Sequence, residues 1–219
     1  RIFNDYIVKT LGVPEKNTKL IINGTTAKIQ RGISWLQNLS ELENGKAELI
    51  FYYSGHGLPH EKTREAYIIP VDVSGKNLEA AIKLDDVYRK LTEHPAKRVS
   101  VFLDACFSGG ARNQGLLAMK SVRIKPKKGY LSGNLVVFAS SSGNESSAVY
   151  RDKHHGFFTY FLLKKWQDSN GDLTYKELAD YLKTNVSKEA LLIEEKIQTP
   201  EILVSPKVEK EWENWRFLK

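Results

Sequence analysis

The stretch Val99-Ser-Val-Phe-Leu-Asp-Ala-Cys106, followed by Phe107-Ser-Gly-Gly110, decides the fold of this chain. Its apolar run is typical of a buried strand, and glycines follow it at once. The strand ends in the only cysteine of the 219 residues. In an open α/β sheet, ligands bind outside the carboxyl ends of the strands. Cys106 therefore stands where a functional side chain is expected.

A second apolar run, Ala47-Glu-Leu-Ile-Phe-Tyr-Tyr53, has the same organisation and ends in Ser54-Gly-His56-Gly57. His56 precedes Cys106 by fifty residues. A thiol and an imidazole at strand ends are the parts of a cysteine nucleophile paired with a histidine. An inert buried cysteine and a loop histidine are the structural alternative. The shared glycine-bearing motifs favour the functional interpretation.

The two motifs and their spacing resemble the caspase-fold cysteine peptidases, in their metacaspase-like (bacterial caspase-like) branch. True caspases carry Gln-Ala-Cys where this chain has Asp104-Ala105-Cys106. The resemblance covers about residues 15–205 and implies a three-layer α/β fold, with a mostly parallel central sheet flanked by helices on both faces. We expect a single peptidase domain over residues 1–219, with a C-terminal tail from about 206 to 219. The family's first strand has no counterpart after Arg1, so we expect it upstream.

The resemblance also implies roles for the site residues. Cys106 attacks the scissile carbonyl, His56 serves as acid and base, and the N–H groups of Cys106 and Gly57 hold the oxyanion. Asp104 and Ser54 line the pocket for the substrate side chain, and an aspartate there implies cleavage after Arg or Lys. Alternation along a strand places Asp104 on the same face as Cys106. From the residues alone, Asp104 could instead cap a turn, and Ser54 could be a turn residue.

The segment from about residue 107 to 132 is rich in Gly, Lys, Arg and Ser and shows no periodicity. It occupies the place where caspase-like enzymes are cut, so we expect self-processing there. Candidate cleavage positions are Arg112, Lys120, Arg123, Lys127 and Lys128. The segment contributes to the net charge of +7. No nucleic-acid motif accompanies it, so we expect a protein or peptide substrate rather than a nucleic acid.

The resemblance raises the possibility of a calcium site, although no cofactor is required for the dyad. The matching positions are Asp72, Asp85, Asp86 and Asn113. Asparagine is a weaker ligand than aspartate, and Asp85 and Asp86 could simply open a helix, where the dipole favours acids. Calcium binding is therefore an open hypothesis.

Bulk properties limit the remaining options. No apolar stretch approaches the roughly 20 residues of a membrane-spanning helix, and a single cysteine excludes an internal disulfide. The sequence carries no initiator methionine or signal segment, so compartment and oligomeric state stay open. A caspase-fold scaffold without turnover and a clostripain-like peptidase remain as alternatives. Locally, we expect a short strand at Lys19–Ile22, a helix capped by Thr25 or Thr26, and a helix capped by Asp85.

Overall fold

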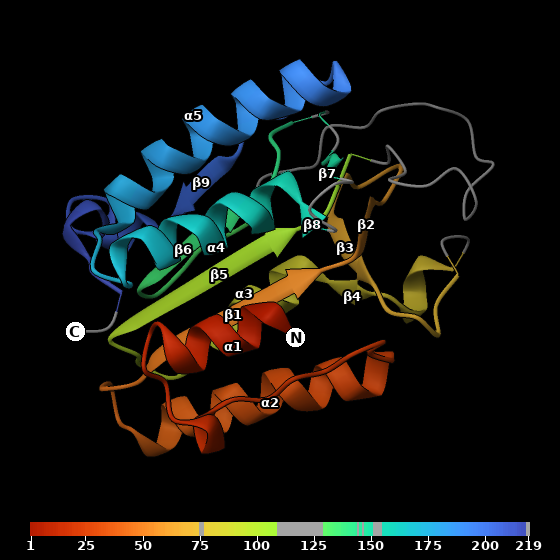
Figure 1. Ribbon diagram of the computed structural model, residues 1–219. Helices are drawn as coiled ribbons and strands as arrows, with labels where there is room; N and C mark the ends of the chain where they lie inside the picture. The colour runs from red at the N-terminus through yellow and green to blue at the C-terminus, as the bar shows by residue number, and fades with distance from the viewer. Residues whose placement is uncertain (75–76, 109–128, 144, 146, 151–154, 218–219) are drawn as a thin grey trace.

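The computed structural model describes residues 1–74, 77–108, 129–143, 145, 147–150 and 155–217 (Figure 1). Its central sheet has the strand order β1-β5-β6-β9. These strands are β1 (Glu48–Ser54), β5 (Arg98–Asp104), β6 (Leu135–Ala139) and β9 (Glu201–Val204). β1, β5 and β6 run parallel, and β9 is antiparallel to β6. The prediction of a mostly parallel sheet is confirmed.

Helices cover both faces of this sheet (Figure 1). One face carries α1 (Ile2–Lys9), α4 (Phe157–Ser169) and α5 (Tyr175–Glu194), and the other carries α2 (Thr26–Leu42) and α3 (Leu84–Leu91). The predicted three-layer α/β architecture is therefore confirmed. None of the helices in the described part of the chain combines the length and hydrophobicity that a bilayer span requires.

Alternation along β5 assigns its side chains to two separate cores. Phe102 packs under α4 and α5, whereas Val101 and Leu103 pack under α2 and α3. Residues at even positions of β5 therefore face α4 and α5, which places Asp104 on that side.

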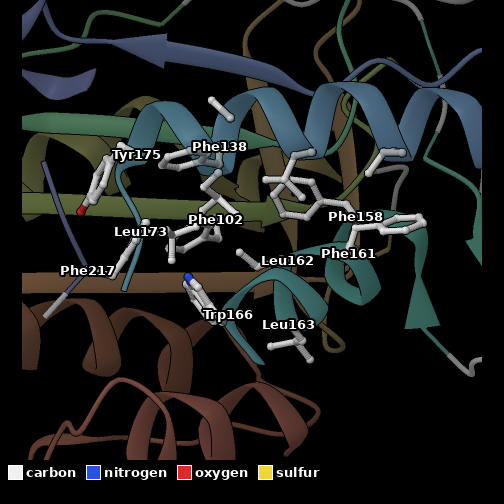
Figure 2. Close-up of a cluster of buried hydrophobic side chains, with 14 of the residues drawn as sticks. Phe102, Phe138, Phe158, Phe161, Leu162, Leu163, Trp166, Leu173, Tyr175 and Phe217 are labelled. Atoms are coloured by element: carbon white, nitrogen blue, oxygen red, sulfur yellow. The ribbon is translucent and has the colours of Figure 1, made fainter. Parts of the chain in front are cut away.

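The core under α4 and α5 is rich in aromatic side chains (Figure 2). Trp166 of α4 meets Phe102 edge to face, with ring centroids 5.4 Å apart. Phe217, near the C-terminus, stacks on Tyr175 at 4.3 Å. The C-terminal tail therefore folds back onto the core and closes it.

Smaller elements surround the carboxyl end of the central sheet. They include the sheet β2-β3-β4 and the pair β7-β8. Their bounds are β2 (His56–Pro59), β3 (Ala66–Ile69), β4 (Ile82–Lys83), β7 (Val149–Tyr150) and β8 (His155–Gly156). Short 3₁₀ helices span Glu15–Asn17, Leu78–Ala80, Pro206–Val208 and Trp212–Asn214.

Two local predictions were wrong and one was confirmed. Lys19–Ile22 is not a strand: residues 17–24 and β1 line the same cavity of about 1170 Å³, and among the described residues β1 pairs only with β5. An extended segment becomes a strand only when another strand accepts its backbone hydrogen bonds. Asp85 lies inside the first turn of α3, whose N-cap position is Lys83. Thr25 does cap α2, because its side chain accepts from the Lys28 N–H at 3.4 Å.

Candidate active site

The two motifs predicted to carry the chemistry leave the sheet side by side. β1 and β5 pair in parallel, with Ser54 directly opposite Asp104. One residue later, the Gly55 N–H donates to the Asp104 carbonyl at 3.3 Å. The chain thus brings the histidine motif and the cysteine motif to the same edge of the sheet.

Gly57 shows how closely the two motifs approach each other. A Cβ atom at this position would lie 2.9 Å from the Cys106 carbonyl oxygen and 2.5 Å from the Phe107 ring. Only a glycine leaves room for this contact. The residue after His56 therefore rests against the backbone of the predicted nucleophile.

His56 is exposed at the start of β2, and its main chain is held by Tyr53. The Tyr53 hydroxyl donates to the His56 carbonyl at 2.8 Å, and a Cβ on Gly55 would lie 2.5 Å from that hydroxyl. Burial raises the pKa of Tyr53, so the phenol stays protonated and keeps donating. Tyr53 thus fixes the backbone while the imidazole remains accessible.

Cys106 is buried, with 5% of its surface exposed. The Ser147 N–H donates to Sγ, and the thiol in turn faces the Ser147 carbonyl at 3.6 Å. Ser147 belongs to a serine-rich stretch, residues 140–147, that directly follows β6. Ser140 and Ser147 are buried, and the only signal of this contact in the sequence is the clustering of serines after an apolar strand.

Asp104 is completely buried and hydrogen-bonded to α4. Thr159 Oγ1 donates to Asp104 Oδ2 at 2.5 Å, and the Tyr52 hydroxyl lies 2.8 Å from the same Oγ1. A threonine hydroxyl has one hydrogen, which goes to the carboxylate, so Tyr52 must donate to Thr159. The distance to Asp104 is that of a charge-assisted O–H···O⁻ bond. Tyr52, Thr159 and Asp104 therefore form a directed chain of hydrogen bonds.

The cavity beside β1 reaches this group of residues. Ser54, His56 and Thr159 all contribute to its lining. Ser54 is exposed, whereas the Asp104 carboxylate lies on the inner side of Thr159. A ligand group entering between Ser54 and Thr159 would approach a buried negative charge.

Two of the four predicted calcium ligands, Asp72 and Asp86, have other partners in the structure. Asp72 Oδ1 accepts from the Thr26 N–H at 2.8 Å at the start of α2, and Asp86 pairs with Arg89 at 2.9 Å. Among the described residues, no three His, Cys, Asp or Glu side chains gather as a metal site. Asn113 lies outside the described residues, as do the candidate self-cleavage positions Arg112, Lys120, Arg123, Lys127 and Lys128.

Comparison with known families identifies the class of protein. The model of peptidase family C14, the caspase domain, matches residues 7–210. The chain belongs to this family, which makes it a caspase-fold cysteine peptidase domain. A search of curated proteins found no match.

Solved structures show the same fold at low sequence identity. Caspase-1 from Spodoptera frugiperda is 16% identical, with a TM-score of 0.60 over 93% of this chain and 76% of the other. Protein GSU0716 from Geobacter sulfurreducens is 17% identical, with a TM-score of 0.59 over 87% of this chain and 79% of the other. At such identities the likeness concerns the fold alone.

Proposed function

We propose that this chain is a cysteine endopeptidase that hydrolyses peptide bonds after Arg or Lys, with Cys106 as nucleophile and His56 as acid and base. The observation that carries the proposal is the meeting of the two strand ends. Ser54 lies opposite Asp104 in the register, and Gly57 rests against the Cys106 carbonyl. Nucleophile, imidazole and a buried carboxylate thereby share one edge of the sheet.

The proposed reaction follows the usual course of acyl transfer to sulfur. The Cys106 thiolate attacks the scissile carbonyl carbon, and the N–H groups of Cys106 and Gly57 hold the resulting oxyanion. His56 gives a proton to the amide nitrogen, the C–N bond breaks, and the amine leaves. His56 then takes a proton from a water molecule whose oxygen attacks the thioester carbonyl. The C–S bond breaks, the carboxylic acid is released, and the Cys106 thiolate and the protonated His56 are restored. The exposure of His56 suits a group that must exchange protons with substrate and water.

The choice of a basic substrate side chain rests on Asp104. A carboxylate removed from water attracts a guanidinium or ammonium group more strongly than an exposed one does. Ser54, at the cavity wall opposite Asp104, adds a hydroxyl that can accept from the same cation. We infer that the substrate side chain enters beside Ser54 and Thr159 to reach this charge.

Fluorogenic peptides that differ only in the residue before the cleaved bond test the proposal. Arg and Lys peptides should be cleaved, whereas peptides with Asp or citrulline, the neutral isostere of Arg, should be poor substrates. Cys106→Ala and His56→Ala should abolish turnover while keeping the wild-type melting temperature. A preference for Asp, or full activity in Cys106→Ala, would contradict the proposal.

The same assay addresses calcium. Asp72 already accepts from the Thr26 N–H at the start of α2 and Asp86 already pairs with Arg89, so we expect chelation to change kcat/KM by less than about twofold. A large loss on chelation, restored by added calcium, would instead establish the metal site.

Self-processing in the basic segment extends the proposal. Its candidate bonds follow Arg112, Lys120, Arg123, Lys127 and Lys128. Intact-mass spectrometry of purified wild type and Cys106→Ala should show cleavage after one or more of these residues in the wild type alone. Identical masses for the two proteins would remove self-processing without affecting the peptidase assignment.

The burial of Cys106 favours a second candidate, a caspase-fold scaffold without turnover. In that case the thiol, 5% exposed and held against Ser147, would have a packing role. Absence of cleavage of every peptide in a basic-residue library, in protein shown to be folded, would favour this candidate.

A further inference from the structure

Gln198 is a fully buried polar residue on the segment leading into β9. Its Oε1 accepts from the Ala148 N–H at 2.7 Å, and its Nε2 donates to the Ser140 carbonyl at 2.9 Å. The Ala148 amide can only donate and the Ser140 carbonyl can only accept. The orientation of the Gln198 side chain is therefore unambiguous.

The two hydrogen-bond partners of Gln198, Ser140 and Ala148, lie at the two ends of the segment that contacts Cys106. Ser140 Oγ donates to the Ala105 carbonyl at 3.2 Å, directly before Cys106. At the other end, Ala148 follows Ser147, whose N–H faces Cys106 Sγ. One side chain thus holds both ends of this stretch against residues 105 and 106.

Glu145 provides a second connection between the segment before β9 and the cysteine motif. Glu145 Oε2 accepts from the Thr199 N–H at 2.6 Å, and the Glu145 carbonyl accepts from Ser108 Oγ at 2.8 Å. Residues 198 and 199 therefore anchor the serine-rich stretch, which in turn contacts Cys106 and Ser108. These contacts connect the approach to β9 with the cysteine motif more than 90 residues earlier.

We propose that Gln198 is a positioning residue for Cys106: it holds Ser147 against the sulfur and so fixes the direction in which the thiol points. The inference rests on the proposed role of Cys106 as nucleophile. A buried amide with both polar atoms paired specifies one arrangement, because any shift of the loop leaves polar groups unsatisfied. Fixing the direction of the thiol matters for attack, which needs the reacting atoms aligned as well as close.

Gln198→Leu removes both hydrogen bonds at similar side-chain size. We expect kcat to fall about 10–100-fold while KM changes by less than about threefold, since misplacement by about 1 Å costs up to about a hundredfold in rate. The loosened loop should also uncover the sulfur, so alkylation of Cys106 by iodoacetamide should accelerate at least about fivefold, given that exposure controls thiol reactivity. The label reports one position, because the chain has a single cysteine.

Ser100→Ala is the matched control. Ser100 is also buried, and its hydroxyl bonds to Tyr175 near the amino end of β5. Ser100 is six positions before Cys106, or about 20 Å along an extended chain. This variant should lose stability but keep the wild-type kcat and alkylation rate. Comparing Ser100→Ala with Gln198→Leu therefore separates the effect of a general loss of stability from the effect of losing the position of the thiol.

Gln198→Glu supplies a rescue that depends on pH. A protonated carboxyl group can accept from Ala148 N–H and donate to the Ser140 carbonyl, as the amide does. Burial favours the neutral acid. We therefore expect wild-type alkylation and turnover, each relative to wild type at the same pH, in mildly acidic buffer. Both should diverge from wild type as the pH rises and the carboxyl group ionises.

The outcomes separate this inference from the proposed function. Values of kcat and alkylation rate within twofold of wild type in Gln198→Leu, or a Gln198→Glu variant without pH dependence, would overturn the role of Gln198. If Gln198→Leu does not fold, Gln198→Glu in acidic buffer carries the same test. If wild type shows no turnover at all, the proposed function fails, and alkylation still tests whether Gln198 positions Cys106.

Discussion

Each end of β5 carries a buried polar side chain that is hydrogen-bonded to a covering helix, but the two side chains differ in charge. Ser100 near the amino end and Asp104 at the carboxyl end point to the same face, and both are buried. Each is bonded to a hydroxyl from a covering helix: Ser100 to Tyr175 of α5, and Asp104 to Thr159 of α4. The two pairs differ in that one is neutral and the other includes a carboxylate.

The Ser100–Tyr175 pair is uncharged, and the two hydroxyls are hydrogen-bonded to each other. Burial raises the pKa of Tyr175 to about 12, so the phenol and Ser100 remain uncharged near neutral pH. A buried carboxylate is more costly to desolvate, and its negative charge can attract a cation from a substrate. Under the proposed function, the neutral pair at the amino end of the strand contributes stability, and the carboxylate at the carboxyl end serves substrate recognition.

Asp104→Asn should produce the largest difference between the two ends. Hydrogen bonds to charged groups contribute about 1.5–3 kcal/mol, so the ratio of kcat/KM for Arg over citrulline peptides should fall about 10–100-fold. Ser100→Ala should leave that ratio unchanged. Competitive cleavage of the two peptides measures it, and an unaltered ratio in Asp104→Asn would remove Asp104 as the selector.

Thr159→Val tests whether the hydroxyl orients the carboxylate. This variant keeps the shape but removes the donor to Asp104, so we expect the Arg-to-citrulline ratio to fall about tenfold, the equivalent of about 1.4 kcal/mol. Thr159→Ser retains the hydroxyl and should retain most of the ratio. Equal losses in the Val and Ser variants would indicate a packing role for Thr159 instead.

Ser100→Ala should affect stability alone. Loss of one buried hydrogen bond lowers the free energy of unfolding by about 1 kcal/mol, measured by urea denaturation. The value of kcat/KM for the Arg peptide should stay within the error of the wild-type value. A change in kcat/KM without a change in stability would contradict the separation of the two ends.

The fold and the two motifs were predictable because local patterns encode them. Apolar runs such as residues 99–103 identify buried strands, and Thr25 provides a recognisable helix start. The strand predicted at Lys19–Ile22 failed because a strand depends on a partner that a local pattern does not reveal. Asp85 was misplaced by two positions from the cap, an error typical of helix ends.

The partners of the site residues were not predictable in the same way. Thr159 follows Asp104 by 55 residues, and Gln198 follows Ser147 by 51. A threonine in an aromatic helix and a glutamine before a strand carry no motif, and their roles arise only when the sheet brings them together. The sequence therefore identified the residues proposed to react, whereas the structure was needed for those that hold them.

The smallest expected effect concerns an ion pair at the amino ends of β1 and β5. Burial raises the pKa of Glu48, but hydrogen bonds from Lys97 and Arg98 outweigh burial and lower it below 4.5. A lowered pKa in the folded protein stabilises it above pH 4.5, and that contribution disappears as the pH falls through the folded value. The free energy of unfolding should therefore differ between wild type and Glu48→Gln by less than about 1 kcal/mol near pH 7. That difference should shrink in acid, and one that grows as the pH falls below 4.5 would contradict the assignment.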